Sequence, residues 1–216
     1  IIILKTKIVT LETEILKTTS GPVCGIDEAG RGPWAGPVVA SAVVLDPDHL
    51  SPALIEGLDD SKKLSAKKRD ILFDRLKSAE ANGAAWIGIG DASSDEIDRL
   101  NILQATFLAM DRAVKGLATC PAHALVDGNC VPPLDCPATT IIKGDQKSLS
   151  IAAASIVAKV TRDRFMNALS DRFPGYGFER HAGYGTVIHR EALERLGVTP
   201  HHRKSFAPIH KILCSD

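Results

Sequence analysis

The chain has 216 residues, of which 44% are hydrophobic and 24% charged, and its formal net charge is zero. This composition argues against a disordered chain, and a chain of this length can bury a full core as one main domain. Its five cysteines include no C-x-x-C pair, so the sequence predicts neither a disulfide framework nor a structural zinc site. The apolar first residues are interrupted by Lys5 and Lys7, which argues against a signal peptide or a membrane span. We therefore expect a cytoplasmic protein with reduced thiols and no membrane contact.

The charges are distributed unevenly along the chain. Residues 1–142 hold 14 basic against 19 acidic side chains, whereas residues 143–216 hold 12 basic against 7 acidic. A neutral chain is unusual for a protein that binds nucleic acid. The excess of positive charge in the last third nevertheless predicts a basic surface there, to which five of the seven histidines belong.

Two adjacent carboxylates, Asp27 and Glu28, follow a short apolar run and precede a glycine-rich loop. The loop leads into residues 38–45, a β-branched run that is typical of a buried strand. A polar turn would explain the pair simply, because such turns favour acidic residues and glycine. Carboxylates held between two core strands are, however, usual candidates for a metal or catalytic site.

The glycines of this loop do not form a dinucleotide-binding motif. Their spacing is G-x-G-x-x-x-G, one residue longer than the motif requires. The segment that follows them has the pattern of a strand, where a dinucleotide site needs the N-terminus of a helix.

Alternating helical and extended patterns occupy the rest of the chain. Apolar residues at helical spacing predict four helices, at 66–80, from Ser94 to about 116, from Ser148 to about 172 and at 188–196. Short apolar runs predict three further strands, at 85–89, 122–126 and 139–142. This order predicts an α/β fold with a mixed sheet flanked by helices. We expect a catalytic domain at 1–172 and a small C-terminal helical unit at 173–216, where Gly, His and Arg become frequent.

The predicted strand ends each deliver carboxylates. Asp27 and Glu28 follow the first strand, and Asp127 and Asp145 follow two later ones. Each acid alone is readily explained as a turn residue or helix cap, but four at strand ends would meet if those strands were neighbours in one sheet. Crowded negative charges are costly unless a cation is present. Ligands that are all oxygen atoms select a hard ion such as Mg²⁺ or Mn²⁺.

Six motifs of this chain resemble, in the same order, those of bacterial ribonuclease H type 2, also called ribonuclease HII. They are Gly25–Pro33, Asp60–Leu64, Val126–Gly128, Lys143–Asp145, Ile151–Val160 and His181–Thr186. The resemblance covers roughly residues 20–207. Ala182 stands where the family often has Lys, and the first twenty residues match nothing in the family.

The resemblance implies a ribonuclease H-like fold with a site of four carboxylates, Asp27, Glu28, Asp127 and Asp145. These would hold two metal ions, Mg²⁺ or Mn²⁺, with Asp27 bridging them. Other residues are implied in substrate binding. The backbone of Gly30, Arg31 and Gly32 and the hydroxyl of Tyr184 would recognise a ribose 2′-OH, and Lys62 and Lys63 would contact phosphates.

For Lys62 and Lys63 a solvated loop is the default alternative. Tyr184 could equally be a core aromatic residue, although its glycine neighbours favour an accessible ring.

The implied activity is a metal-dependent endonuclease that cleaves the RNA strand of RNA–DNA hybrids and the 5′ side of single ribonucleotides in duplex DNA. Its products would carry a 3′-hydroxyl and a 5′-phosphate, and we expect the enzyme to act as a monomer. Two alternatives stay open: a ribonuclease H of type 1 or type 3, and a catalytically silent nucleic-acid-binding module. The first differs in substrate choice, and the second would lack metal ligands.

Overall fold

The computed structural model describes residues 10–46, 48–58 and 64–214. Its centre is a five-stranded sheet in the order β3-β2-β1-β4-β5. The strands are β1 (Val23–Ala29), β2 (Val38–Leu45), β3 (Ala85–Ala92), β4 (His123–Asp127) and β5 (Ala138–Ile141). β2 runs antiparallel to β1 and to β3, whereas β4 runs parallel to β1 and to β5. The predicted mixed sheet is therefore confirmed.

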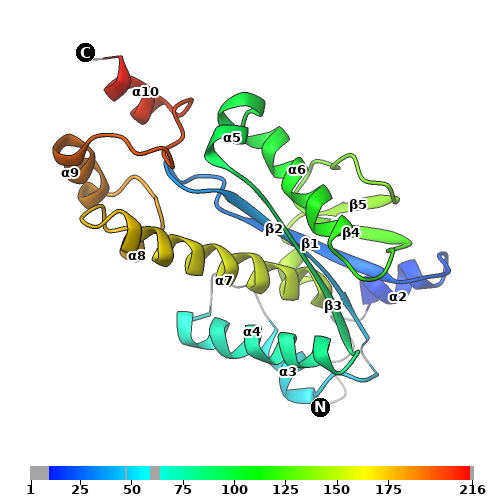
Figure 1. Cartoon of the computed structure of the whole chain (residues 1–216). Coiled ribbons are helices and arrows are strands. Elements are labelled where there is room, and N and C mark those ends of the chain that lie inside the picture. The colour runs from blue at the N-terminus through cyan, green and yellow to red at the C-terminus, as the bar shows by residue number, and fades with distance from the viewer. Residues whose placement is uncertain (1–9, 47, 59–63, 215–216) are drawn as a thin grey trace.

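Helices cover both faces of the sheet (Figure 1). α6 (Ile102–Lys115) packs on one face, while α7 (Leu149–Arg172) and α4 (Ala66–Ala81) pack on the other. Small side chains let α7 approach β1 closely, since a Cβ on Gly25 would lie 2.2 Å from the backbone nitrogen of Ile151. In the described part of the chain, no helix combines the length and the apolar character needed to cross a membrane.

The single helix expected from Ser94 to about 116 is wrong, because the chain breaks at Asn101. α5 (Ser94–Leu100) ends there and α6 begins, and Asn101 has a left-handed φ of 69°. Its side-chain oxygen accepts hydrogen bonds from the backbone N–H groups of Leu103 and Gln104, so it caps α6. The cap of α5 is Ser93 and not Ser94, because the Ser93 side chain accepts from the backbone N–H of Glu96.

The sequence patterns did not predict α2 (Thr10–Leu16) or α3 (Pro52–Gly57). Leu11 and Ile15 of α2 pack beside the start of β1. Glu12 reaches the N-terminus of α7, where its Oε1 accepts a hydrogen bond from the backbone N–H of Ser150 at 3.1 Å. A carboxylate at this end of a helix is stabilised by the helix dipole.

The residues after α7 form α8 (Phe178–His181), α9 (Val187–Leu196) and α10 (Ala207–Leu213) beside the end of α7 (Figure 1). Apolar residues of this segment form a separate buried cluster with three residues from earlier in the chain, Ala35, Met166 and Leu169. Because the cluster spans residue 172, the division into 1–172 and 173–216 stays a prediction.

Candidate active site

The strand register brings two of the predicted acids side by side. Ile26 of β1 is paired with Val126 of β4, so Asp27 and Asp127 come next on two adjacent parallel strands. The sequence had suggested that Asp27 and Glu28 follow the end of the first strand. In the structure both residues lie within β1. Asp145 lies in a 3₁₀ turn, Gly144–Gln146, after β5. The pairing of β1 with β4 therefore shows that Asp27 and Asp127 are adjacent, which the spacing of the motifs in the sequence could not show.

Both aspartates face α7. Val23 of β1 and Leu125 of β4 pack against Ile151 of α7. Side chains alternate between the faces of a strand, so Asp27 and Asp127 project from the same face as these apolar residues. Ser155, one helical turn beyond Ile151, gives Asp27 a side-chain hydrogen bond. The underside of the two aspartates is thus formed by the alanine-rich helix.

The surroundings of Asp27 shift its pKa strongly. Its side chain is buried, and burial together with the charges of Glu28 and Asp127 raises its pKa well above the usual range. Hydrogen bonds from Ser155 and from the backbone N–H of Glu28, at 2.7 Å, act in the opposite direction. A buried carboxylate beside two others is the environment that a divalent cation would stabilise.

Each acid also has local partners. Asp127 Oδ1 accepts from the backbone N–H of Gly144 at 2.7 Å, and Glu28 Oε1 accepts from Arg31 Nη1 at 3.4 Å. Asp145 is buried and lines a hollow together with Asp127. Among the described residues, no three acidic, histidine or cysteine side chains converge on one point that could hold a metal ion. Electrostatic interactions link Asp27 to Glu28 and to Asp127, and Asp127 lines the same hollow as Asp145.

The glycine-rich loop is held from behind by two buried arginines. Arg203 donates to the carbonyl oxygens of Gly30 at 2.5 Å, Arg31 at 2.9 Å and Gly36 at 3.0 Å. Arg162 donates in the same way, to the carbonyls of Pro37, Ala182 and Ala35. Both side chains are almost fully buried. Bonds to five backbone carbonyls therefore fix the loop whose glycines were predicted to meet the substrate, and the bond to Ala182 ties it to the C-terminal part of the chain.

Burial lowers the pKa of Arg162 to about 10, and burial together with repulsion by Arg162 lowers the pKa of Arg203 to about 9. Sequence reasoning missed both residues. Arg162 could have been found from helical spacing, because it lies four residues after buried Ala158 and four before buried Met166. Arg203 lies outside the helices and strands and has no such signal.

Tyr184 lies close to this loop, and its ring is accessible. The residue is 49% exposed, which excludes the alternative of a core aromatic residue. It lines a hollow of about 310 Å³ together with Glu28, Gly32 and Lys159. A Cβ on Gly32 would lie 3.4 Å from the Tyr184 ring, so loop and ring bound the same space. Lys62 and Lys63 lie outside the described residues.

A mixed five-stranded sheet with acids on its two central parallel strands defines the class as a ribonuclease H-like nuclease. The family model described as Ribonuclease HII matches residues 24–209. A ribonuclease HII of Jannaschia sp. (strain CCS1) is 57% identical over 202 residues, covering 93% of this chain and 97% of its own length. The chain belongs to the ribonuclease HII family, and it is a hydrolase that acts on RNA in RNA–DNA hybrids.

Solved structures agree with this assignment. The crystal structure of ribonuclease H2 from Pyrococcus horikoshii OT3 is 29% identical, with a TM-score of 0.72, covering 88% of this chain and 96% of that one. The structure of Bst-RNase HIII in complex with Mn²⁺ has a TM-score of 0.68 at 20% identity, covering 91% of this chain and 70% of that one. The second likeness concerns the fold alone.

Proposed function

We propose that this enzyme cuts the phosphodiester bond on the 5′ side of a ribonucleotide, including a single ribonucleotide embedded in duplex DNA. The products would carry a 3′-hydroxyl and a 5′-phosphate. The observation that supports this best is the shared hollow, which joins Glu28 to the Gly32 loop and the exposed Tyr184 ring. A scissile phosphate near the acids would place the adjacent ribose against that loop.

We infer that Asp27, Glu28, Asp127 and Asp145 hold two divalent cations, Mg²⁺ or Mn²⁺. Their donor atoms are all carboxylate oxygens, which suit these hard ions. The raised pKa of Asp27 supports the inference, since a cation would stabilise its charged form. When bound, such ions supply an activated water and stabilise charge on the leaving oxygen.

Selectivity for ribose would come from groups of the protein around the 2′-OH. This hydroxyl alone distinguishes ribose from deoxyribose, so recognition needs hydrogen-bond partners held in fixed positions. We propose the peptide groups of Gly30, Arg31 and Gly32 as such partners, and the absence of a side chain at Gly32 lets the substrate approach them closely. We propose the Tyr184 hydroxyl as a further partner, and Lys62 and Lys63 as phosphate contacts.

An assay on three duplexes tests the proposal: all-DNA, DNA with one ribonucleotide, and a long RNA–DNA hybrid. With Mg²⁺ or Mn²⁺, we expect cleavage of the second and third but not of the first. Cleavage of the long hybrid alone would contradict the proposal and indicate type 1 behaviour.

Asp27→Asn keeps the size of the side chain but removes its charge, so we expect less than about a tenth of wild-type cleavage with duplex binding retained. A silent binding module would instead show binding but no cleavage in the wild-type protein as well. Retained activity of Asp27→Asn at saturating metal would contradict the central role of Asp27.

A further inference from the structure

Three buried histidines lie directly behind Tyr184, and the proposed chemistry uses none of them. His189 and His202 have no exposed surface, and His181 is 9% exposed. Aromatic rings enclose them, with Trp34 centred 5.6 Å from the His189 ring and Phe178 centred 5.8 Å from the His202 ring. Buried histidines in an aromatic surrounding need fixed hydrogen-bond partners.

The backbone groups at one end of this cluster fix the proton of His202. The backbone N–H of Thr199 donates to His202 Nδ1 at 2.9 Å. An amide N–H can only donate, so Nδ1 of His202 carries no proton. In a neutral imidazole the proton then lies on Nε2. His202 Nε2 is therefore a donor.

The opposite end fixes the proton of His189 independently. His189 Nδ1 lies 3.0 Å from the carbonyl oxygen of Tyr184, which can only accept a hydrogen bond. His189 therefore carries its proton on Nδ1, and its Nε2 is an acceptor. The two Nε2 atoms lie 3.0 Å apart, and the assignments made from the two ends supply one donor and one acceptor. A continuous chain of hydrogen bonds therefore runs from the Thr199 N–H through His202 and His189 to the carbonyl oxygen of Tyr184.

His181 keeps the His189 ring in place. Its Nδ1 accepts from the backbone N–H of Gly183 at 3.2 Å, so its Nε2–H donates to the carbonyl of Tyr176 at 2.8 Å. The His181 and His189 rings are stacked, with centroids 4.7 Å apart and an interplanar angle of 14°. Burial lowers the pKa of both His189 and His202 to about 4, so these two rings are neutral near pH 7.

The position of the Tyr184 ring depends on its backbone, because the ring itself is half exposed. The Tyr184 N–H donates to the carbonyl of His181 at 2.9 Å, and its carbonyl accepts from Thr186 N–H at 2.8 Å and from His189. Among these partners of the Tyr184 backbone, His189 is the one that contributes a side chain, and that side chain is fully buried.

We propose that His202 and His189 are positioning residues whose ordered protons hold Tyr184 at the ribose-recognition site and so set the selectivity for a single ribonucleotide. This inference rests on the proposed role of Tyr184. Two measurements test it, and the first is independent of that role.

The first measurement is the tautomeric state of the histidines in ¹⁵N-labelled protein, read from ring nitrogen shifts and ring-proton couplings by NMR at neutral pH. We expect the proton of His189 on Nδ1 and the protons of His181 and His202 on Nε2. A neutral histidine in water favours Nε2, so the Nδ1 form of His189 is the diagnostic result. A His189 proton found on Nε2 would overturn the proposal.

The second measurement compares two substitutions of His189. Asparagine places an amide near the position of Nδ1 and can still donate to the Tyr184 carbonyl. Glutamine places its amide near Nε2 and loses that donor. We expect His189→Gln to lower the ratio of kcat/KM on the single-ribonucleotide duplex to that on the long hybrid by about fivefold or more, the factor expected for one lost hydrogen bond. His189→Asn should change the ratio by less than about twofold.

A matched control is the same pair of substitutions at His210, which is exposed on α10. Thermal unfolding of all four variants shows whether each is folded at the assay temperature. A loss of folded protein lowers kcat/KM on both substrates alike and leaves their ratio unchanged. Equal ratios for His189→Gln and His189→Asn, in folded proteins, would overturn the proposal.

Tyr184→Phe separates this inference from the proposed function. If Tyr184→Phe lowers the ratio but His189→Gln does not, the positioning role alone is wrong. If Tyr184→Phe leaves the ratio unchanged, the recognition role of Tyr184 is wrong, and the selectivity part of this inference is wrong with it.

Discussion

At the scale of single residues, the glycine-rich loop depends on two glycines for different reasons. Gly30 has a φ of 98°, and a Cβ there would lie 2.0 Å from Nε of the buried Arg162. Gly32 is exposed and has no such conflict, since the nearest atom to its Cβ would be in the Tyr184 ring at 3.4 Å. Position 30 is therefore required by the fold, and position 32 is open for the substrate.

We predict that Gly30→Ala destabilises the protein by more than about 2 kcal/mol, because a side chain strains the backbone and displaces Arg162. Gly32→Ala should change stability by less than about 1 kcal/mol. It should nevertheless reduce cleavage of the single-ribonucleotide duplex, because its methyl group occupies the space between loop and ring. Denaturant unfolding and the duplex assay measure the two effects. Equal destabilisation by both changes would contradict this division of roles.

At the scale of elements, hydrogen bonds join the β1–β2 loop to the C-terminal segments. The backbone N–H of Trp34 donates to the carbonyl of Gly183, and that of Gly36 donates to the carbonyl of His201. Ala35 forms an isolated bridge with His202. Figure 1 shows this loop beside the segment between α9 and α10. The buried histidines lie where the loop meets the C-terminal segments, so we expect their protonation to weaken the packing between these two parts of the chain.

We predict that the contribution of His202 to stability falls as the pH is lowered from about 6.5 to about 4. The pKa of His202 is near 4 in the folded protein but about 6.5 when unfolded, so the unfolded state binds the proton first. The contribution of His202 to the free energy of unfolding is complete above pH 6.5 and is lost as the pH falls towards 4. One such histidine contributes roughly 3 kcal/mol at most. Denaturant unfolding at a series of pH values measures the loss.

His202→Asn provides the comparison for this experiment. Its side-chain oxygen can still accept from the Thr199 N–H, but asparagine does not titrate. The loss of stability between pH 6.5 and 4 should therefore be clearly smaller in the variant. Hydrogen bonds with Arg112 lower the pKa of Glu96 to about 2, so the contribution of Glu96 to stability is lost only below about pH 4.5 and leaves the range from 6.5 to 4.5 to His202. An unchanged slope would show that His202 is not the titrating group.

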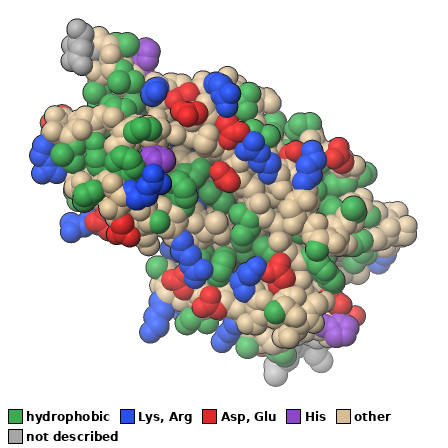
Figure 2. All heavy atoms as spheres, in the orientation of Figure 1, with side chains coloured by type: hydrophobic (Ala, Val, Ile, Leu, Met, Phe, Trp, Pro, Cys, Tyr) green, Lys and Arg blue, Asp and Glu red, His purple; other side chains and the backbone are tan. Residues whose placement is uncertain are grey.

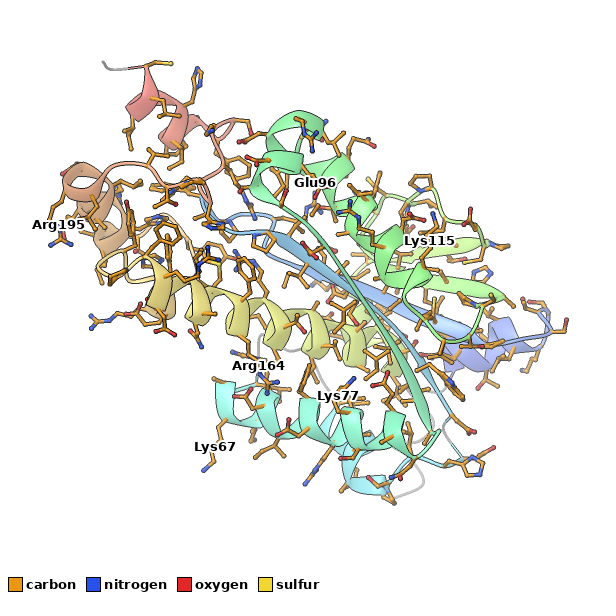
Figure 3. The ribbon with its side chains drawn as sticks, in the orientation of Figure 1. Lys67, Lys77, Glu96, Lys115, Arg164 and Arg195 are labelled. Carbon is orange, nitrogen blue, oxygen red and sulfur yellow. The ribbon has the colours of Figure 1, made fainter. Side chains whose placement is uncertain are left out.

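At the scale of the whole molecule, the two signs of charge are mixed. Figure 2 shows Lys and Arg side chains interspersed with Asp and Glu on the face in view. Several cations there are paired, such as Arg164 with Asp70 at 3.5 Å. Figure 3 places Arg164 and Lys115 on opposite sides of the sheet, on α7 and α6. The basic surface expected of residues 143–216 stays a prediction.

We predict that duplex binding weakens steeply with salt, because phosphate contacts release counterions. Lys143, which lines the hollow beside Asp127 and Asp145, is the cation we expect to contribute. Lys143→Ala should reduce the slope of log K against log salt by about one. Lys115, which is paired with Asp111 at 2.8 Å, is the control and should leave the slope unchanged. Equal slopes for Lys143→Ala and wild type would place the phosphates elsewhere.

The amino-acid sequence alone determined the mixed α/β class and most elements, because these follow from local patterns, and it singled out the four acids as site candidates. Apolar alternation and helical spacing depend on residues close in the chain, and β2 was predicted at its observed bounds. Asn101 shows the limit of this reasoning, since an apolar stripe continued across it although its left-handed backbone divides the helix. The ordered motifs likewise indicated the ribonuclease HII family before any geometry was known.

Only the tertiary structure decided which groups hold the site in place. The pairing of β1 with β4 puts Asp27 beside Asp127, although 100 positions separate them in the sequence. Arg203 reaches the carbonyl of Gly30 from a segment that carries no regular pattern. The proton order of His189 and His202 depends on a carbonyl and an amide that the fold brings to opposite ends of the pair. Such contacts depend on long-range packing of buried polar groups, and local sequence patterns carry no record of which partner each group will meet.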